Sequence, residues 1–190
     1  MYIEETTFEK TDFKSLSIQS YEYENCIFNN CDFSDTNLAG TKFIECQLKG
    51  CNLSLAKLSD TIFRDVIFSD CKMIGLLFCD CNKFGLSFRF DNCNLNHSSF
   101  QDAKIKKTIF KNCLLHEVDF TNCDLTNATL TGCDLQNAKF ENTVLESADL
   151  RTSFRYSINP NINKIKKAIF SISSIEGLLH TYQIKIDKIT

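Results

Sequence analysis

The strongest constraint on the fold is an apolar residue that recurs at every fifth position of the chain. From Phe8, each step of five residues meets an apolar side chain as far as Phe78, and a second series with the same spacing runs from Phe90 to Leu150. A period of five fits neither an α-helix, which repeats about every 3.6 residues, nor a long strand, which alternates between two faces. It fits short extended segments joined by regularly spaced turns, so we expect a solenoid.

Two further positions of the repeat are restricted in size or type. The apolar residue at every fifth position is called the repeat centre. Two residues before each centre the side chain is usually Cys, Ala, Ser or Thr, and two residues after it Asn, Asp and Gly predominate. Asn, Asp and Gly adopt tight corners and positive φ at low cost. We therefore predict an all-β, four-sided parallel β-helix, in which coils of about 20 residues stack about seven deep through ladder hydrogen bonds.

Several five-residue segments share one motif. Cys31–Asp35 reads Cys-Asp-Phe-Ser-Asp, Cys123–Asn127 reads Cys-Asp-Leu-Thr-Asn, and Ala148–Thr152 reads Ala-Asp-Leu-Arg-Thr. They resemble the pentapeptide-repeat proteins, whose motif is a small residue, Asx, Leu or Phe, a polar residue, and Gly or Asx. The resemblance covers about Phe8 to Thr152, and it implies a right-handed quadrilateral β-helix over residues 1–152.

The repeat is interrupted once, between Phe78 and Phe90. These centres are twelve residues apart, two more than two repeats require. We expect residues 79–89 to bulge, with Gly85 supplying the flexibility.

The side chains of this bulge allow two interpretations. In the first, Phe84, Leu86 and Phe88 plug a widened core. In the second, the bulge is an exposed recognition loop in which Lys83 and Phe84 contact a partner.

The repeat stops after Leu150, and residues 153–190 are predicted to be a C-terminal cap and dimerisation segment. Pro160 and its neighbouring asparagines indicate a connection, after which Ala168 and Phe170 return to the register of Leu150. Ser173 and Glu176 have the spacing of a helix capping box.

An amphipathic helix and a strand are expected to end the chain. Apolar residues follow Ser173 at helical spacing, and Gln183–Asp187 alternates like a strand. One interpretation is that they only cap the end of the solenoid, which would otherwise expose core and strand edges. The preferred one is a two-fold homodimer through this end, with the interface formed by Ile175, Leu178, Leu179, Tyr182, Ile184 and Ile186.

The eleven cysteines are interpreted as packing residues. Nine of them occupy the small inward position, where a thiol is the size of Ala, Ser or Thr. Cys79 and Cys81 are too closely spaced for a usual zinc motif, and stacked neighbours seldom meet disulfide geometry. We therefore expect no metal and no cofactor.

The sequence also indicates a protein that is not an enzyme. It contains no nucleophile elbow, phosphate-binding glycine loop or metal-ligand cluster. His97, His116 and His180 have no Ser, Cys or Asp at a telling spacing, so they are interpreted as surface or rim residues.

Charge and hydropathy limit the partners and the compartment. Residues 1–150 carry 22 acidic against 14 basic side chains, a balance of −8, whereas residues 151–190 carry 2 against 7, or +5. The acidic body disfavours direct nucleic-acid binding. No apolar run is long enough to span a membrane and no secretory signal is seen, so we expect a cytoplasmic protein with reduced thiols.

The tail suggests a narrower group. Asn159-Pro160, Ile165-Lys166-Lys167-Ala168, Gly177-Leu178-Leu179 and Tyr182 resemble the Qnr-type quinolone-resistance proteins. The resemblance implies a dimeric rod that mimics DNA, binds DNA gyrase or topoisomerase IV, and protects it from fluoroquinolones.

Acidic outer positions are the candidates for that contact. They are Asp35, Asp60, Asp65, Asp70, Asp102, Glu117, Asp124 and Asp134. The alternative function is a structural or scaffolding module with an unknown protein partner, because fold does not determine function.

Overall fold

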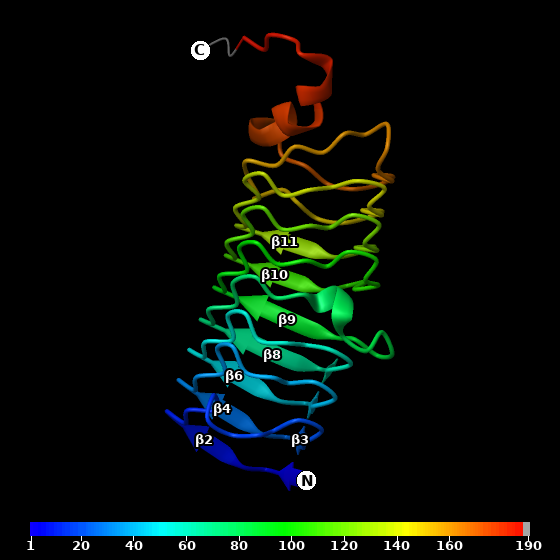
Figure 1. The fold of residues 1–190 in the computed structure, drawn as a ribbon. Coiled ribbons are helices and arrows are strands. Elements are labelled where there is room, and N and C mark those ends of the chain that lie inside the picture. Colours follow the sequence, from blue (N-terminus) through cyan, green and yellow to red (C-terminus); the bar gives the residue numbers. More distant parts are fainter. Residues whose placement is uncertain (188–190) are drawn as a thin grey trace.

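The protein is a rod of stacked coils, with the N-terminus and the last described residues at opposite ends (Figure 1). The computed structural model describes residues 1–187. One side carries a parallel sheet of four strands: β1 (Tyr2–Glu4), β3 (Glu22–Glu24), β5 (Lys42–Ile44) and β7 (Ile62–Arg64). The next carries seven: β2 (Thr7–Glu9), β4 (Ile27–Asn29), β6 (Gln47–Lys49), β8 (Val66–Ser69), β9 (Phe88–Asp91), β10 (Ile109–Lys111) and β11 (Thr129–Thr131). On the other two sides, successive coils pair through single parallel bridges.

The strand register confirms the predicted coil length. Phe8 lies opposite Phe28, and Phe28 opposite Leu48, so each coil contains twenty residues. Across the interruption Phe68 lies opposite Phe90, an offset of 22, and the next pair returns to twenty. The predicted right-handed, four-sided β-helix is confirmed, and the interruption is contained within one coil.

Repeat centres fill the interior of the rod. Between coils their rings stack: the Phe13 and Phe33 centroids are 4.3 Å apart with the planes 7° from parallel. Around one coil the rings meet edge-on, as Phe28 and Phe33 do at 5.5 Å and 68°. Each such pair contributes about 0.5–1.5 kcal/mol beyond the area it buries. The core is therefore one continuous column of apolar side chains.

The cysteines pack this column, as predicted. All eleven are free thiols, and all except Cys79 are buried. Several thiols donate to a carbonyl of the preceding coil, as Cys46 Sγ does to Tyr23 O at 3.4 Å. At the equivalent position Thr41 Oγ1 donates to Ile18 O at 2.8 Å. A thiol and a small hydroxyl thus make the same hydrogen bond at this position.

The corners adopt the left-handed backbone that the Asn, Asp and Gly pattern predicts. Asn30 and Asp35 have φ of 53° and 55°. At the corner occupied by Gly50, with φ of 63°, a Cβ would lie 2.5 Å from Asn30 Oδ1. A larger residue at that corner would therefore require the Asn30 side chain below it to move.

The two extra residues lie between Asn82 and Ser87, after the short 3-10 helix η1 (Phe78–Asp80). The Asn82 amide still donates to Thr61 O at 3.0 Å in the ordinary register, whereas Phe88 already lies opposite Val66 with the offset of 22. Gly85 turns between them with φ of 67°.

The side chains of the insertion separate instead of gathering. Phe84 is 87% exposed, so the expectation that it packs with Leu86 and Phe88 is wrong. Phe88 is buried, and its ring lies 5.4 Å from that of Phe78 and 5.0 Å from that of Phe90. Leu86 is half-buried against the same core. Phe88 occupies a position where other coils have a small residue, so its volume replaces the inward side chain that the insertion does not supply.

The ladder continues past residue 152. Phe154 bridges to Asp134, and Ile169 bridges to Asp149. The Leu150 amide donates to Ile169 O at 2.8 Å. The predicted return to register around Ala168 and Phe170 is confirmed.

The helix expected after Ser173 takes a different form. The chain forms two 3-10 helices, η2 (Ile172–Leu178) and η3 (His180–Tyr182). Ser173 lies inside η2, whose N-cap is Ser171, so the prediction of a capping box that begins at Ser173 is wrong. The Gly177 carbonyl accepts from the Ile158 amide at 2.8 Å, which ties η2 to the end of the stack instead of continuing a helix.

The strand expected over Gln183–Asp187 is also absent. Gln183 ends η3 with φ of 52°, and Ile184–Asp187 is irregular. Alternation alone does not make a strand, since a strand needs a neighbouring edge to pair with.

Candidate functional site

The predicted acidic contacts are mostly exposed corner residues. Asp35, Asp60, Asp65, Asp70, Asp102 and Glu117 all have positive φ and lie at the surface. The register places Asp60 and Asp102 on one corner of the rod and Asp35 and Glu117 on another. Asp65 and Asp70 lie on the remaining two. The structure therefore distributes these acids around the rod and does not bring them onto one face.

Among residues 1–187, the side chain of each of these acids except Asp35 also bonds to a neighbouring coil. Asn122 Nδ2 donates to Asp102 Oδ1 at 2.9 Å, and Asn92 Nδ2 donates to Asp70 Oδ1 at 2.7 Å. His97 Nδ1 lies 3.3 Å from Glu117 Oε2. The remaining pairs are Asn82 with Asp60 and Ser87 with Asp65. The corner acids thus have a structural role beside any role in binding.

Asp124 is half-buried on a flat side of the coil instead of at a corner. It accepts hydrogen bonds from the Thr126 amide and hydroxyl at 3.1 and 2.6 Å, and Lys106 Nζ lies 3.2 Å away. Burial raises the pKa of Asp124, but the Thr126 hydrogen bonds and the Lys106 ammonium together hold it below the usual range.

The prediction that Asp134 is an outer contact residue is wrong. Asp134 is 3% exposed. Its Oδ1 accepts from Arg155 Nε at 2.8 Å, its Oδ2 lies 2.7 Å from His116 Nε2, and a second Arg155 nitrogen pairs with it. The position is an outward one, but Arg155 from the following coil folds over it.

The tip of the insertion is exposed, as the recognition-loop interpretation requires. Lys83 and Phe84 both lie at the surface. Arg64 lies beneath the turn, since a Cβ on Gly85 would be 3.4 Å from its Nε. The insertion thus adds an exposed aromatic ring to a region of positive charge.

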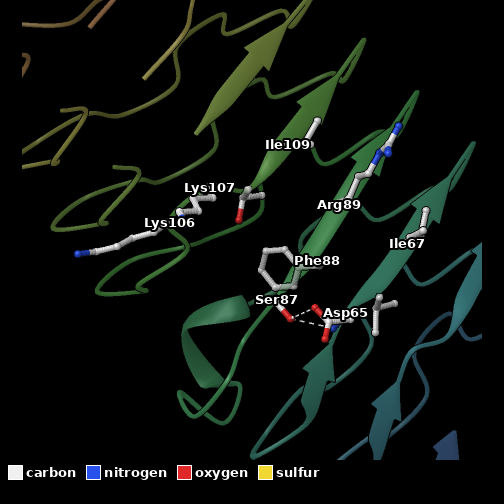
Figure 2. Close-up of a pocket in the computed structure, with 10 residues that line it drawn as sticks. Asp65, Ile67, Ser87, Phe88, Arg89, Lys106, Lys107 and Ile109 are labelled. Atoms are coloured by element: carbon white, nitrogen blue, oxygen red, sulfur yellow. Dashed lines mark hydrogen bonds between the residues drawn. The ribbon is translucent and has the colours of Figure 1, made fainter. Parts of the chain in front are cut away.

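A groove of about 460 Å³ opens beside the insertion (Figure 2). Its floor comes from three adjacent strands, with Ile67 on β8, Arg89 on β9 and Ile109 on β10. One wall is formed by Lys106 and Lys107, which lie at the corner before β10.

The lower edge of the groove holds Ser87 and Asp65. Ser87 Oγ donates to Asp65 Oδ1 at 2.9 Å and accepts from the Asp65 amide at 2.7 Å. The sequence patterns did not reveal this groove. Stacking residues 67, 89 and 109 at the coil spacing, with the offset of 22 across the break, would have placed its floor.

The C-terminal end exposes much of its apolar surface. Ile175, Tyr182, Ile184 and Ile186 are 39–56% exposed, and Ile172, which was not predicted, is 93% exposed. Leu178 and Leu179 are half-buried, and Leu178 packs against the core. The six predicted interface residues therefore divide into four exposed residues and two that belong to the cap.

Residues 1–187 contain no group of three or more His, Cys, Asp or Glu side chains placed to bind a metal ion. Within the same range, no helix combines the length and apolar character needed to cross a membrane.

Solved structures with the same architecture include several repeat proteins. A trypsin-treated variant of QnrB1, a plasmid-mediated fluoroquinolone resistance protein, matches with a TM-score of 0.74 and 17% identity, over 99% of this chain and 92% of that one. A second trypsin-treated variant gives 0.63 and 17%, over 98% of both chains. HetL, from the cyanobacterium Nostoc sp. strain PCC 7120 and involved in heterocyst differentiation regulation, gives 0.48 and 17%, over 90% of this chain and 85% of that one.

Sequence comparison identifies the family. No curated protein sequence matches the chain. The family model described as "Pentapeptide repeat region" matches residues 21–89 and 83–150, which together span most of the β-helix. The chain belongs to the pentapeptide repeat family.

Proposed function

We propose that this chain is a non-enzymatic binding rod, that its partner is a type II DNA topoisomerase such as DNA gyrase or topoisomerase IV, and that it protects that enzyme from fluoroquinolones. The observation that carries the proposal is the match to QnrB1, a fluoroquinolone resistance protein, along 99% of this chain at a TM-score of 0.74. The resemblance of the C-terminal tail to the Qnr-type proteins supports it independently of the coil. The proposal includes a cytoplasmic location, where the topoisomerases act.

The mechanism is steric and electrostatic. A rod whose body carries a balance of −8 would enter the basic surface on which a topoisomerase holds DNA. Acids on all four corners, among them Asp60, Asp65 and Asp70, present negative charge in whichever rotation the rod docks. The phosphate charges of duplex DNA are likewise distributed around its axis.

The proposal includes a homodimer through the C-terminal end. Exposed apolar side chains gather there, from Ile172 to Ile186. A soluble chain seldom leaves such a patch uncovered. A two-fold partner would cover it and would double the length of the rod.

Direct binding tests the proposal. Gyrase is immobilised, and the wild-type protein is compared with a variant carrying Asp60→Asn, Asp70→Asn and Asp102→Asn. Asparagine occupies the same corners at Asn122 and Asn92, so the variant loses charge while it keeps the corner geometry. We expect micromolar or tighter binding that excess duplex DNA displaces, with at least about tenfold weaker binding by the variant. Failure of the wild-type protein to bind gyrase would overturn the proposal.

A scaffolding function with a different protein partner is the second candidate. One observation favours it: the positive groove beside the insertion interrupts the acidic surface near the middle of the rod. Binding to gyrase that DNA does not displace would point to a topoisomerase partner without DNA mimicry. Absence of binding would leave the second candidate.

A further inference from the structure

We infer that the groove beside the insertion binds an acidic segment of a protein partner, one that also carries an apolar side chain. The inference concerns a surface separate from the acidic corners, and it does not require the partner to be a topoisomerase. Three features of the groove support it: its charge, its apolar floor and its position at the one irregularity of the rod.

The charge of the groove is opposite to that of the body. Arg89, Lys106 and Lys107 line it against a single acid, Asp65, whose Oδ1 is already bonded to Ser87. Lys107 has no ion-pair partner within 4.0 Å in the part of the chain that the structure describes. Arg64, which lies beneath Gly85 of the insertion, likewise has no ion-pair partner within 4.0 Å among residues 1–187.

The neighbouring acids only partly neutralise this charge. Asp124 pairs with Lys106 at 3.2 Å, and Asp91 lies 3.9 Å from Arg89 and 3.2 Å from Lys111. The basic side chains of these contacts are exposed, so an incoming carboxylate can reach Lys106 and Arg89 beside the half-buried Asp124 and Asp91.

The floor of the groove is apolar. Ile67 and Ile109 are 37% and 38% exposed on either side of the aliphatic part of Arg89, and Phe88 lies behind them. Figure 2 shows Ile67, Arg89 and Ile109 on three neighbouring strands, with Lys106 and Lys107 on the loop before β10 and the Lys106 side chain extending away from the strands. A ligand that matched only the charge would leave this surface uncovered.

A peptide fits this combination better than a nucleic acid does. A nucleic acid carries its charge along its whole length, and beyond the groove it would run over a body with a balance of −8. A short acidic segment ends within the basic patch and avoids that repulsion. Its apolar side chain would lie on Ile67 and Ile109 while its carboxylates meet Arg89 and Lys107.

The test uses a groove variant that the repeat itself suggests. Arg89→Gln, Lys106→Thr and Lys107→Asn each introduce the residue type that another coil has in the same column, at Gln47, Thr126 and Asn127. The control variant removes three positive charges elsewhere, by Lys49→Asn, Lys57→Asn and Lys72→Asn. There the asparagine of the preceding coil is copied, at Asn29, Asn37 and Asn52. Circular dichroism and thermal unfolding check that both variants fold.

The probe is a short fluorescein-labelled peptide of Asp and Glu with one central Phe, and its binding is followed by fluorescence anisotropy. Two comparison peptides replace the Phe by Ser, or the acids by Asn and Gln. We expect the groove variant to bind the probe about tenfold or more weakly than the wild-type protein, and the control variant to stay within about twofold. Both comparison peptides should bind more weakly than the probe.

Three results would overturn the inference: no binding of the probe, equal binding by the groove and control variants, or tighter binding of an oligonucleotide of equal charge that displaces the probe. Equal binding of the Ser peptide would show that the apolar floor does not contribute to binding, and it would contradict the inference as well. If the triple variant does not fold, Lys107→Asn and Arg89→Gln are measured singly against the same limits. Since the probe contains no topoisomerase sequence, this result is separate from the gyrase test.

Discussion

The rings of Phe78 and Phe100 stack almost parallel, with centroids 4.5 Å apart, although 22 residues separate them instead of 20. The interior column is therefore continuous past the insertion. The two extra residues change only the side of the coil between Asn82 and Ser87, where they expose Phe84 and open the groove. The insertion therefore changes the surface of one coil while the stacking of rings in the core continues.

The first prediction concerns the two phenylalanines of the insertion. Phe88→Ala should lower the free energy of unfolding by about 3–5 kcal/mol, because it removes a ring buried between Phe78 and Phe90. Phe84→Ala should change it by less than about 0.5 kcal/mol, because that ring is exposed. Chemical denaturation of both variants measures the difference, and equal losses would show that Phe88 does not support the core.

The second prediction concerns thiol reactivity. Cys79 is the one cysteine that is not buried, and burial raises its pKa, so it should react slowly with a disulfide reagent and faster as the pH rises. The other ten should react only after denaturation. Thiol counting in the native and unfolded states measures this, with Cys79→Ser as the control that should abolish native labelling. Rapid labelling of several thiols in the native protein would contradict the packing role.

The third prediction concerns the buried carboxylate of Asp134. Asp134→Ala should destabilise the protein by about 1–3 kcal/mol, since it removes the carboxylate that pairs with His116 and Arg155 and leaves Arg155 its bond to Gln136 alone. Asp119→Ala is the matched control. Asp119 Oδ1 accepts from the Thr121 amide as Asp134 Oδ1 accepts from the Gln136 amide, but the nearest basic nitrogen, Lys139 Nζ, is 3.9 Å away. The control should lose less than about 1 kcal/mol. Equal losses in thermal or denaturant unfolding would mean that the contacts with His116 and Arg155 are not stabilising.

The fourth prediction concerns the C-terminal end. The wild-type protein should have twice the chain mass of 21.8 kDa by light scattering. Ile175→Glu, Ile184→Glu and Ile186→Glu together should give a monomer, because they place charge in an apolar interface. Leu178 and Leu179 are left unchanged because they belong to the cap. Ile27→Thr, on the side of the rod, is the control that should remain dimeric. A monomeric wild-type protein or a dimeric triple variant would limit this end to capping.

Sequence periodicity predicted the coil well for physical reasons. Each centre from Phe8 to Leu150 has to fill the same inward space, so every repeat has an apolar residue at this position and the period is easily recognised. The position of Asp134 could not be predicted in this way, because Arg155 lies beyond the regular repeat and covers a side chain that the pattern directs outward. The 3-10 form of Ile172–Leu178 depends on the contact of Gly177 with Ile158, which no local pattern contains.

The groove was missed because its residues are far apart in sequence. Ile67, Arg89 and Ile109 become neighbours only when the offset of 22 is applied at the break. Exposure of Phe84 and burial of Phe88 likewise depend on which of the inserted residues takes the turn. Gly85 takes the turn, with φ of 67°, and Phe84 before it is exposed while Phe88 after it is buried.

The supercoiling activity of DNA gyrase in the presence of ciprofloxacin tests the proposed function most directly. We expect the wild-type protein to restore supercoiling in a concentration-dependent way, and the variant with Asp60→Asn, Asp70→Asn and Asp102→Asn to restore less. The groove variant reports separately whether the basic patch takes part. No restoration at micromolar protein, together with no binding to gyrase, would contradict the topoisomerase proposal.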